Sequence, residues 1–153
     1  MEIIRLKSDL VSINISETEK ELLRELTHDL LRKLGNENPQ TLVPRLFPEA
    51  ILDEPELNSK YKAMTLNQLE NSHRKAAEAL TLLTSGNEIS LEDFILVTKG
   101  LNIIRLQLSE ALDINDELQN PLTPGDNQNR AWVIFQYLGQ MLFQCIEELD
   151  RDF

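Results

Sequence analysis

Four polar residues on one predicted helix face lie within a mainly apolar stretch of the chain, and they are the first candidates for chemistry. They are spaced three or four positions apart, so a helix would place them on one face: Thr98, Asn102, Arg105 and Ser109. A buried arginine is usually paired with a carboxylate and with carbonyls of the same protein, and we favour this structural interpretation of Arg105. In the alternative, Arg105 and Asn102 bind an anionic or carboxylate-bearing ligand, because a guanidinium holds a carboxylate through two parallel hydrogen bonds.

Both histidines of the chain follow a glutamate by three positions, as Glu25…His28 and Glu70…His73. Two such motifs on separate helices occur in di-iron proteins of the ferritin type. Here the two motifs face differently, because His73 falls on the apolar side of its helix whereas Glu25 and His28 lie opposite a leucine stripe. We therefore expect neither a metal site nor any other cofactor.

Cys145 is the only cysteine, and it lies among apolar residues near the C-terminus. A buried cysteine usually behaves as a small apolar side chain, and a single cysteine excludes an intramolecular disulfide. The sequence contains no nucleophile-elbow motif and no glycine-rich phosphate-binding loop. We therefore predict that the protein is not an enzyme.

The net charge of −11 over 153 residues limits the classes of partner. Nucleic-acid binding needs clustered Lys and Arg to neutralise phosphates, and an anionic membrane surface would also repel an acidic protein. The N-terminus lacks the apolar core of a signal peptide, and no apolar run is long enough to span a bilayer. We expect one cytoplasmic domain over residues 1–153, bound to neither nucleic acid nor membrane and large enough to bury its own core.

The elements that would position the candidate residues are mainly helical. Alternating apolar and polar residues predict a β-hairpin over 2–15 with its turn at Ser8-Asp9. Apolar periodicity and capping signals predict helices over 17–34, 66–85, 91–112 and 129–149. The helix over 91–112 is apolar nearly all round, so the others should surround it, and a short connection should pack it antiparallel to the helix before it. The predicted fold is all-α, a loosely bundle-like four-helix domain with a small N-terminal hairpin.

Three details of this prediction depend on short signals. Ser16 and Glu19 fit a capping box that opens the first helix, and Thr65 and Gln68 fit a second one that would open the helix over 66–85. Residues 36–63 hold four prolines and are expected to be mainly irregular, and 116–129 is expected to be a polar loop. The last helix should face inward through Trp132, Phe135, Leu138, Leu142, Ile146 and Leu149.

The order of four sequence blocks is the basis of a family resemblance. After the hairpin come ETEKELLRELTHDLL, RLFPEAILDEPELNSKYKAMT, LNIIRLQLSEALDI and AWVIFQYLGQMLFQCIEEL. The most specific residues are Leu46-Phe47-Pro48 with the acidic run 53–56, and Leu101-Asn102 with Arg105-Leu106. Over nearly its whole length the chain resembles an actinobacterial family known as a domain of unknown function, whose genes often lie beside the gene for the ClpS protease adaptor. The resemblance implies a context near regulated proteolysis, and no activity, cofactor or catalytic residue.

The leading functional hypothesis is a non-enzymatic cytoplasmic interaction or regulatory protein, connected through the resemblance with adaptor-dependent proteolysis. Its partner would be a protein, and an acidic surface would face a basic partner: Glu49, Asp53, Glu54 and Glu56. A second copy of the chain could instead add a strand at the open hairpin edge, which would make a homodimer.

Two alternatives to this hypothesis stay open. The first is a DNA-binding transcriptional regulator, a label that some members of the resembled family carry. That function needs a basic recognition helix, and the most basic candidate is the single pair Arg74-Lys75. The second is a small-ligand-binding protein or an enzyme that uses Arg105 and Asn102.

Overall fold

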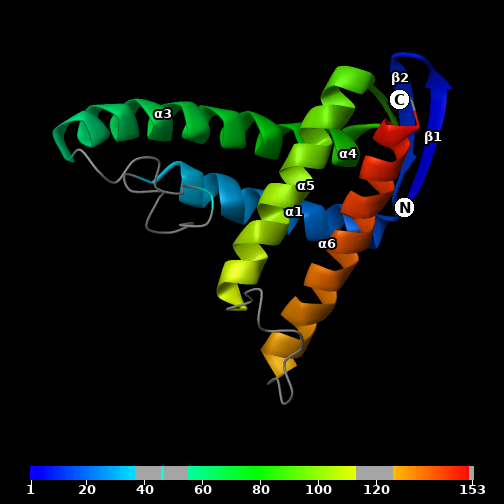
Figure 1. Ribbon diagram of the computed structural model, residues 1–153. Helices are drawn as coiled ribbons and strands as arrows, with labels where there is room; N and C mark the ends of the chain where they lie inside the picture. The colour runs from blue at the N-terminus through cyan, green and yellow to red at the C-terminus, as the bar shows by residue number, and fades with distance from the viewer. Residues whose placement is uncertain (37–45, 47–54, 113–125, 152–153) are drawn as a thin grey trace.

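A computed structural model describes residues 1–36, 46, 55–112 and 126–151 of the chain (Figure 1). The elements follow in the order β1 (Glu2–Lys7), β2 (Leu10–Asn14), α1 (Glu17–Leu34), α3 (Pro55–Ala79), α4 (Leu82–Ser85), β3 (Glu88–Ser90), α5 (Leu91–Ala111) and α6 (Asp126–Asp150). Figure 1 shows α1 and α3 lying along one axis with opposite chain directions, and α5 and α6 crossing them. The prediction of a mainly helical fold with a small N-terminal hairpin is confirmed.

The hairpin forms as predicted, with its turn at Ser8-Asp9 and Ile3 opposite Ile13. The sequence analysis missed a third strand, β3, which pairs antiparallel with β2. This strand has only three residues, too few for an alternating pattern to be recognised. It forms because Ile89 lies opposite Val11, and both side chains are buried. The strand order β1-β2-β3 leaves β1 at an edge of this sheet.

Helix α5 is the centre of the molecule, as its apolar circumference predicted. The Ser90 hydroxyl accepts the Asp93 amide at 3.1 Å and so caps the helix. Helices α1, α3 and α6 and strands β2 and β3 all pack against α5. The largest fully buried side chains of the core are almost all aliphatic: Phe94, Leu23, Leu30, Leu34, Leu80, Leu101, Ile104, Leu138, Met141, Val11 and Val97.

The helix predicted over 66–85 is different in the structure. Helix α3 begins at Pro55, so Thr65 and Gln68 lie inside a helix and not at its start. Proline suits the first turn of a helix, because the amide hydrogen that it lacks would have no partner there. A capping box is a short local pattern, and here the longer helical segment overrides it.

The other end of α3 also differs, because the helix stops at Ala79 and a separate turn, α4, follows. The amides of Leu80 and Thr81 donate to carbonyls three residues back, both at 3.1 Å. This tighter winding ends the α-helical pattern before Leu82. At the start of α6, Asp126 is helical, so the last three residues before 129 belong to the helix and not to the predicted loop.

The expected antiparallel packing of α3 against α5 is wrong, because α5 crosses α3 (Figure 1). Between the two helices α4 and β3 occupy the connection, so the chain does not turn directly back. The helices approach each other closely at Gly100, where an added Cβ would lie 2.5 Å from the carbonyl oxygen of Ala76. Among the described helices, none combines the length and the apolar character needed to span a membrane.

Candidate functional site

Arg105 extends from α5 toward α6 and ends an aromatic stack. Its Cζ lies 4.2 Å from the centroid of the Phe135 ring, and the Trp132 ring stacks on Phe135 with centroids 5.8 Å apart and an interplanar angle of 25°. A guanidinium over an aromatic face is attracted by about 0.5–2 kcal/mol. The side chain is therefore held in one place before any ligand arrives.

Gly139 of α6 makes room for this guanidinium. A Cβ at Gly139 would lie 3.1 Å from Nε of Arg105 and 3.5 Å from its Nη2. Nε is buried and has no hydrogen-bond partner in the part of the chain that the structure describes. Arg105 also lines an open groove, so a molecule bound in the groove would meet this side chain.

The interpretation of Arg105 as half of an internal ion pair finds no partner in the structure. Within residues 1–36, 46, 55–112 and 126–151, ion pairs form at the N-terminus and at several basic side chains, and none involves Arg105. The predicted tie to residues 47–54 lies outside the described residues. A buried donor without a partner costs about 1–3 kcal/mol of stability.

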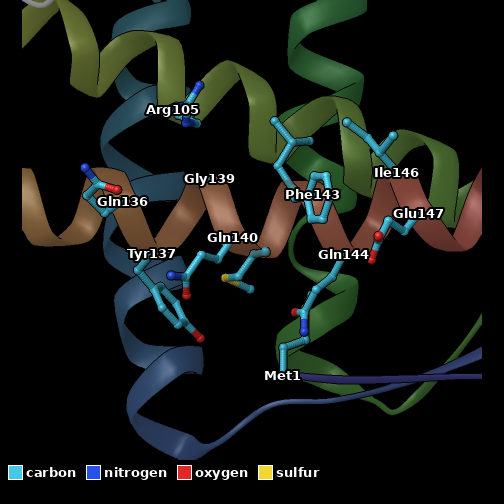
Figure 2. A pocket seen from close by; sticks show the side chains of 12 residues that line it. Met1, Arg105, Gln136, Tyr137, Gly139, Gln140, Phe143, Gln144, Ile146 and Glu147 are labelled. Carbon is cyan, nitrogen blue, oxygen red and sulfur yellow. The ribbon is translucent and has the colours of Figure 1, made fainter. Parts of the chain in front are cut away.

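The groove follows α6 and has a volume of about 760 Å³, within the range of ligand-binding clefts (Figure 2). Arg105 lies on one side of α6 and Tyr137 on the other. The described lining residues include one basic side chain (Arg105), one carboxylate (Glu147) and three glutamines, Gln136, Gln140 and Gln144, together with the N-terminal residue Met1. The hydroxyl of Tyr137 is buried and has no partner among the described residues.

Large apolar side chains are exposed on α6 along and beside this groove. Val133 is 64% exposed, Phe143 61% and Ile146 42%. The prediction that Ile146 faces inward is therefore wrong. The buried face of α6 runs through Leu138, Met141 and Cys145, and Glu148 lies on the same face. The sequence predicts Ile146 in the core because it continues an i, i+4 series from Leu142. Helix α6, however, carries apolar residues on two sides, and only one of these sides packs against the rest of the domain.

The other polar residues predicted to share a face with Arg105 do not join the groove. The hydroxyls of Thr98 and Ser109 donate to carbonyls of their own helix, to Phe94 at 2.8 Å and Leu106 at 2.6 Å. This back-bonding satisfies hydroxyls inside a helix. Asn102 is exposed and does not belong to the groove lining. The predicted pair of Arg105 and Asn102 is thus not brought together in this groove.

The two glutamate–histidine motifs have separate structural surroundings. Nε2 of His73 lies 2.8 Å from the carbonyl oxygen of Leu46, and Glu70 pairs with Arg74 at 2.6 Å. Glu25 and His28 are exposed on α1. Among the described residues, no three metal-binding side chains form a cluster that could hold an ion.

Cys145 is fully buried between helices, on the face of α6 that meets the core. Burial raises the pKa of the thiol from 9.0 to about 12, against a smaller lowering by a hydrogen bond with Thr98. The thiol is therefore protonated at neutral pH, and a protonated thiol is a poor nucleophile.

The remaining residues predicted to bind a partner are an acidic segment, a basic pair and the edge of the hairpin. Glu49, Asp53 and Glu54 lie outside the described residues, as does the side chain of Glu56, although α3 includes its backbone. Arg74, the basic candidate for a recognition helix, is engaged by Glu70 and also donates to the Leu34 carbonyl at 3.3 Å. The hairpin presents Ile4 and Leu6 of the edge strand β1 to solvent.

Sequence reasoning missed a buried carboxylate, Glu148, which is only 8% exposed. Its side chain lies 3.6 Å from Nε of Arg5 and 3.4 Å from Arg151, and Arg5 also donates to the Glu148 carbonyl at 3.2 Å. The contacts join β1 to the end of α6. Because Arg5 and Glu148 are far apart in sequence, no local pattern announces this pair.

The comparisons with known proteins give one match. The model of the DUF2017 family, a domain of unknown function, matches residues 1–149. No curated protein and no solved structure matches the chain. A match over almost the whole chain confirms that the sequence resemblance was to a family of unknown function, and the protein belongs to the DUF2017 family.

Proposed function

We propose that the protein is a non-enzymatic cytoplasmic interaction protein with a regulatory role, and that its partner binds along the groove of α6. The observation that carries the proposal is that exposed Phe143 and Ile146 line the same groove as Arg105, whose Nε has no hydrogen-bond partner among the described residues. Apolar side chains that gather at a surface with a few polar groups are typical of interaction sites.

A narrower form of the proposal connects the partner with adaptor-dependent proteolysis. Its support is the resemblance carried by Leu101-Asn102 and Arg105-Leu106 and the gene neighbourhood that the resemblance implies. Binding of the purified ClpS adaptor to the purified protein tests this form directly. Absence of binding would remove the link to the adaptor and leave the groove proposal unaffected.

The groove proposal is tested with a matched pair of substitutions. Phe143→Glu places a charge on the α6 surface, and Met64→Glu places the same charge on α3, at a methionine that is 59% exposed. Wild type and both variants, each tagged, are used to capture proteins from the cytosol of the source cells. Retained proteins are identified by mass spectrometry, purified, and titrated against the three proteins by calorimetry.

We expect one partner to bind wild type and Met64→Glu with equal affinity and to bind Phe143→Glu at least tenfold more weakly. The new carboxylate would lose its hydration in an apolar contact without gaining a counter-ion, and this cost lowers the affinity for the partner. Equal binding of the partner to wild type and Phe143→Glu would contradict the proposal. Loss of the partner in Met64→Glu alone would move the interaction surface to α3.

A further inference from the structure

We infer that the groove of α6 receives an amphipathic helix of the partner, and that Arg105 binds an aspartate or glutamate side chain of that helix. Apolar side chains of the same helix would then contact Phe143 and Ile146. The inference rests on the proposed function and deepens it, because it names the chemistry by which the partner is recognised.

The charge balance of the chain makes it informative that Arg105 forms no ion pair with a described residue. The sequence has 26 acidic residues and 15 basic ones, so carboxylates are abundant. Several basic side chains form ion pairs with them: Arg5, Lys20, Arg32, Lys33, Arg74 and Arg151. Arg105 forms none with a described residue. A carboxylate supplied by a partner would give Arg105 an ion pair.

The surroundings of Arg105 favour a carboxylate over a phosphate. Arg105 supplies the only basic side chain among the described residues that line the groove, and Glu147 lines the same groove. The N-terminal ammonium of Met1, which also lines it, already pairs with Glu19 at 3.6 Å. A phosphate monoester carries nearly two negative charges at neutral pH and usually meets several basic groups, whereas a carboxylate carries one charge and fits one guanidinium fork. The stack on Phe135 and the contact with Gly139 hold the guanidinium in advance, which lowers the entropy lost on binding.

The exposed apolar residues of the groove indicate where the apolar side chains of the partner helix would bind. At 1.5 Å per residue, Phe143 lies about 6 Å and Ile146 about 10 Å along α6 from Gly139, against which Arg105 rests. Ile146 lies on the same side of α6 as Arg105, and the groove continues past Arg105 in both directions, from Gln136 to Glu147 (Figure 2). A partner helix matches this spacing if apolar residues follow its acidic residue by one turn and by two turns. Anchor residues of bound helices recur in this way at i, i+4 and i+7.

The experiment uses the full chain and three synthetic peptides. The first is an acetylated, amidated alanine-rich helix with glutamate at position i and leucine at i+4 and i+7. The second replaces that glutamate with glutamine, and the third keeps glutamine and ends in a free carboxylate. Trp132 is the only tryptophan and stacks on Phe135, so its fluorescence reports binding at Arg105.

We expect the glutamate peptide to bind at least tenfold more tightly than the glutamine peptide, a difference of about 1.4 kcal/mol. Arg105→Gln should abolish the difference. Arg32→Gln removes the same charge from α1, where Arg32 is exposed, and should preserve the difference. Circular dichroism and thermal melting confirm that each variant is folded.

Equal binding of the glutamate and glutamine peptides to wild type, or binding of neither, overturns the inference even if Arg105→Gln fails to fold. Tightest binding of the third peptide would assign the site to a chain terminus and overturn the choice of a side chain. If Phe143→Glu loses the captured partner while the two amidated peptides bind equally, the proposed function stands and only the carboxylate inference fails.

Discussion

The close approach of α3 and α5 at Gly100 predicts that Gly100→Ala destabilises the protein. An added Cβ would lie 2.5 Å from the Ala76 carbonyl oxygen and 2.8 Å from Cγ of Leu80. The carbonyl belongs to the backbone of α3 and cannot rotate away, and both neighbours are buried. The two helices must therefore move apart to admit one methyl group.

Two opposing effects determine the size of the change. Overpacking a well-filled core costs about 1–3 kcal/mol, and alanine gains about 0.8–1.0 kcal/mol over glycine inside a helix. Because the nearest atom is a rigid backbone carbonyl, we expect the overpacking cost near its upper end and a net loss of about 1–2 kcal/mol. For a domain of this size each kcal/mol shifts Tm by about 2–4 °C, so Tm should fall by roughly 2–8 °C.

Thermal and urea unfolding, followed by circular dichroism, measure this loss. Gly86→Ala is the matched control, since its backbone is extended with φ −169° and an added Cβ meets nothing within 4 Å. Alanine at such a position should stabilise the protein by about 0.4–1 kcal/mol, because it lowers the conformational entropy of the unfolded chain. The two substitutions should thus act in opposite directions. A Tm of Gly100→Ala equal to or above that of wild type would refute the close crossing of α3 and α5.

Two further predictions concern titrating groups. Desolvation by itself would raise the pKa of Asp29, but hydrogen bonds from Arg32, Lys33 and Gln107 outweigh it, and the folded pKa lies below 3.8. The stability that Asp29 adds is therefore present above this pH and lost as the pH falls through the folded pKa. Urea unfolding should show Asp29→Asn less stable than wild type at about pH 7 and equal to it in strong acid; a difference independent of pH would contradict the assignment. For Cys145, burial raises the pKa of the thiol from 9.0 to about 12, so the unfolded state loses its proton first and stability should fall as the pH rises above 9.0. Cys145→Ala should lessen this alkaline loss, and rapid labelling of the native thiol by a thiol reagent would argue against its burial.

Local signals in the sequence were sufficient where their physical cause is local. The capping box of α1 forms as predicted, with the Glu19 amide donating to Ser16 Oγ at 3.1 Å and the Ser16 amide to Glu19 Oε1 at 3.0 Å. Both partners lie within one helical turn, so no other part of the chain is required. The boundaries of α1 and the start of α5 were predicted correctly for this reason.

The same kind of signal failed where distant segments decide the outcome. Thr65 and Gln68 form a valid capping pattern, yet they lie inside α3. Strand β3 exists because β2 is present to pair with Ile89. Neither outcome is encoded within the few residues concerned, and each depends on what packs beside them.

The sequence alone established a mainly helical domain and identified the helix at its centre, because apolar periodicity reports which faces of a helix need cover. It also singled out Arg105 as a charge within an apolar segment. Only the tertiary structure decided what surrounds that charge. Phe135 and Gly139 come from α6, and the outward direction of Ile146 depends on which side of α6 meets the domain. Periodicity defines an apolar face, but the packing of the other helices determines whether that face is core or surface.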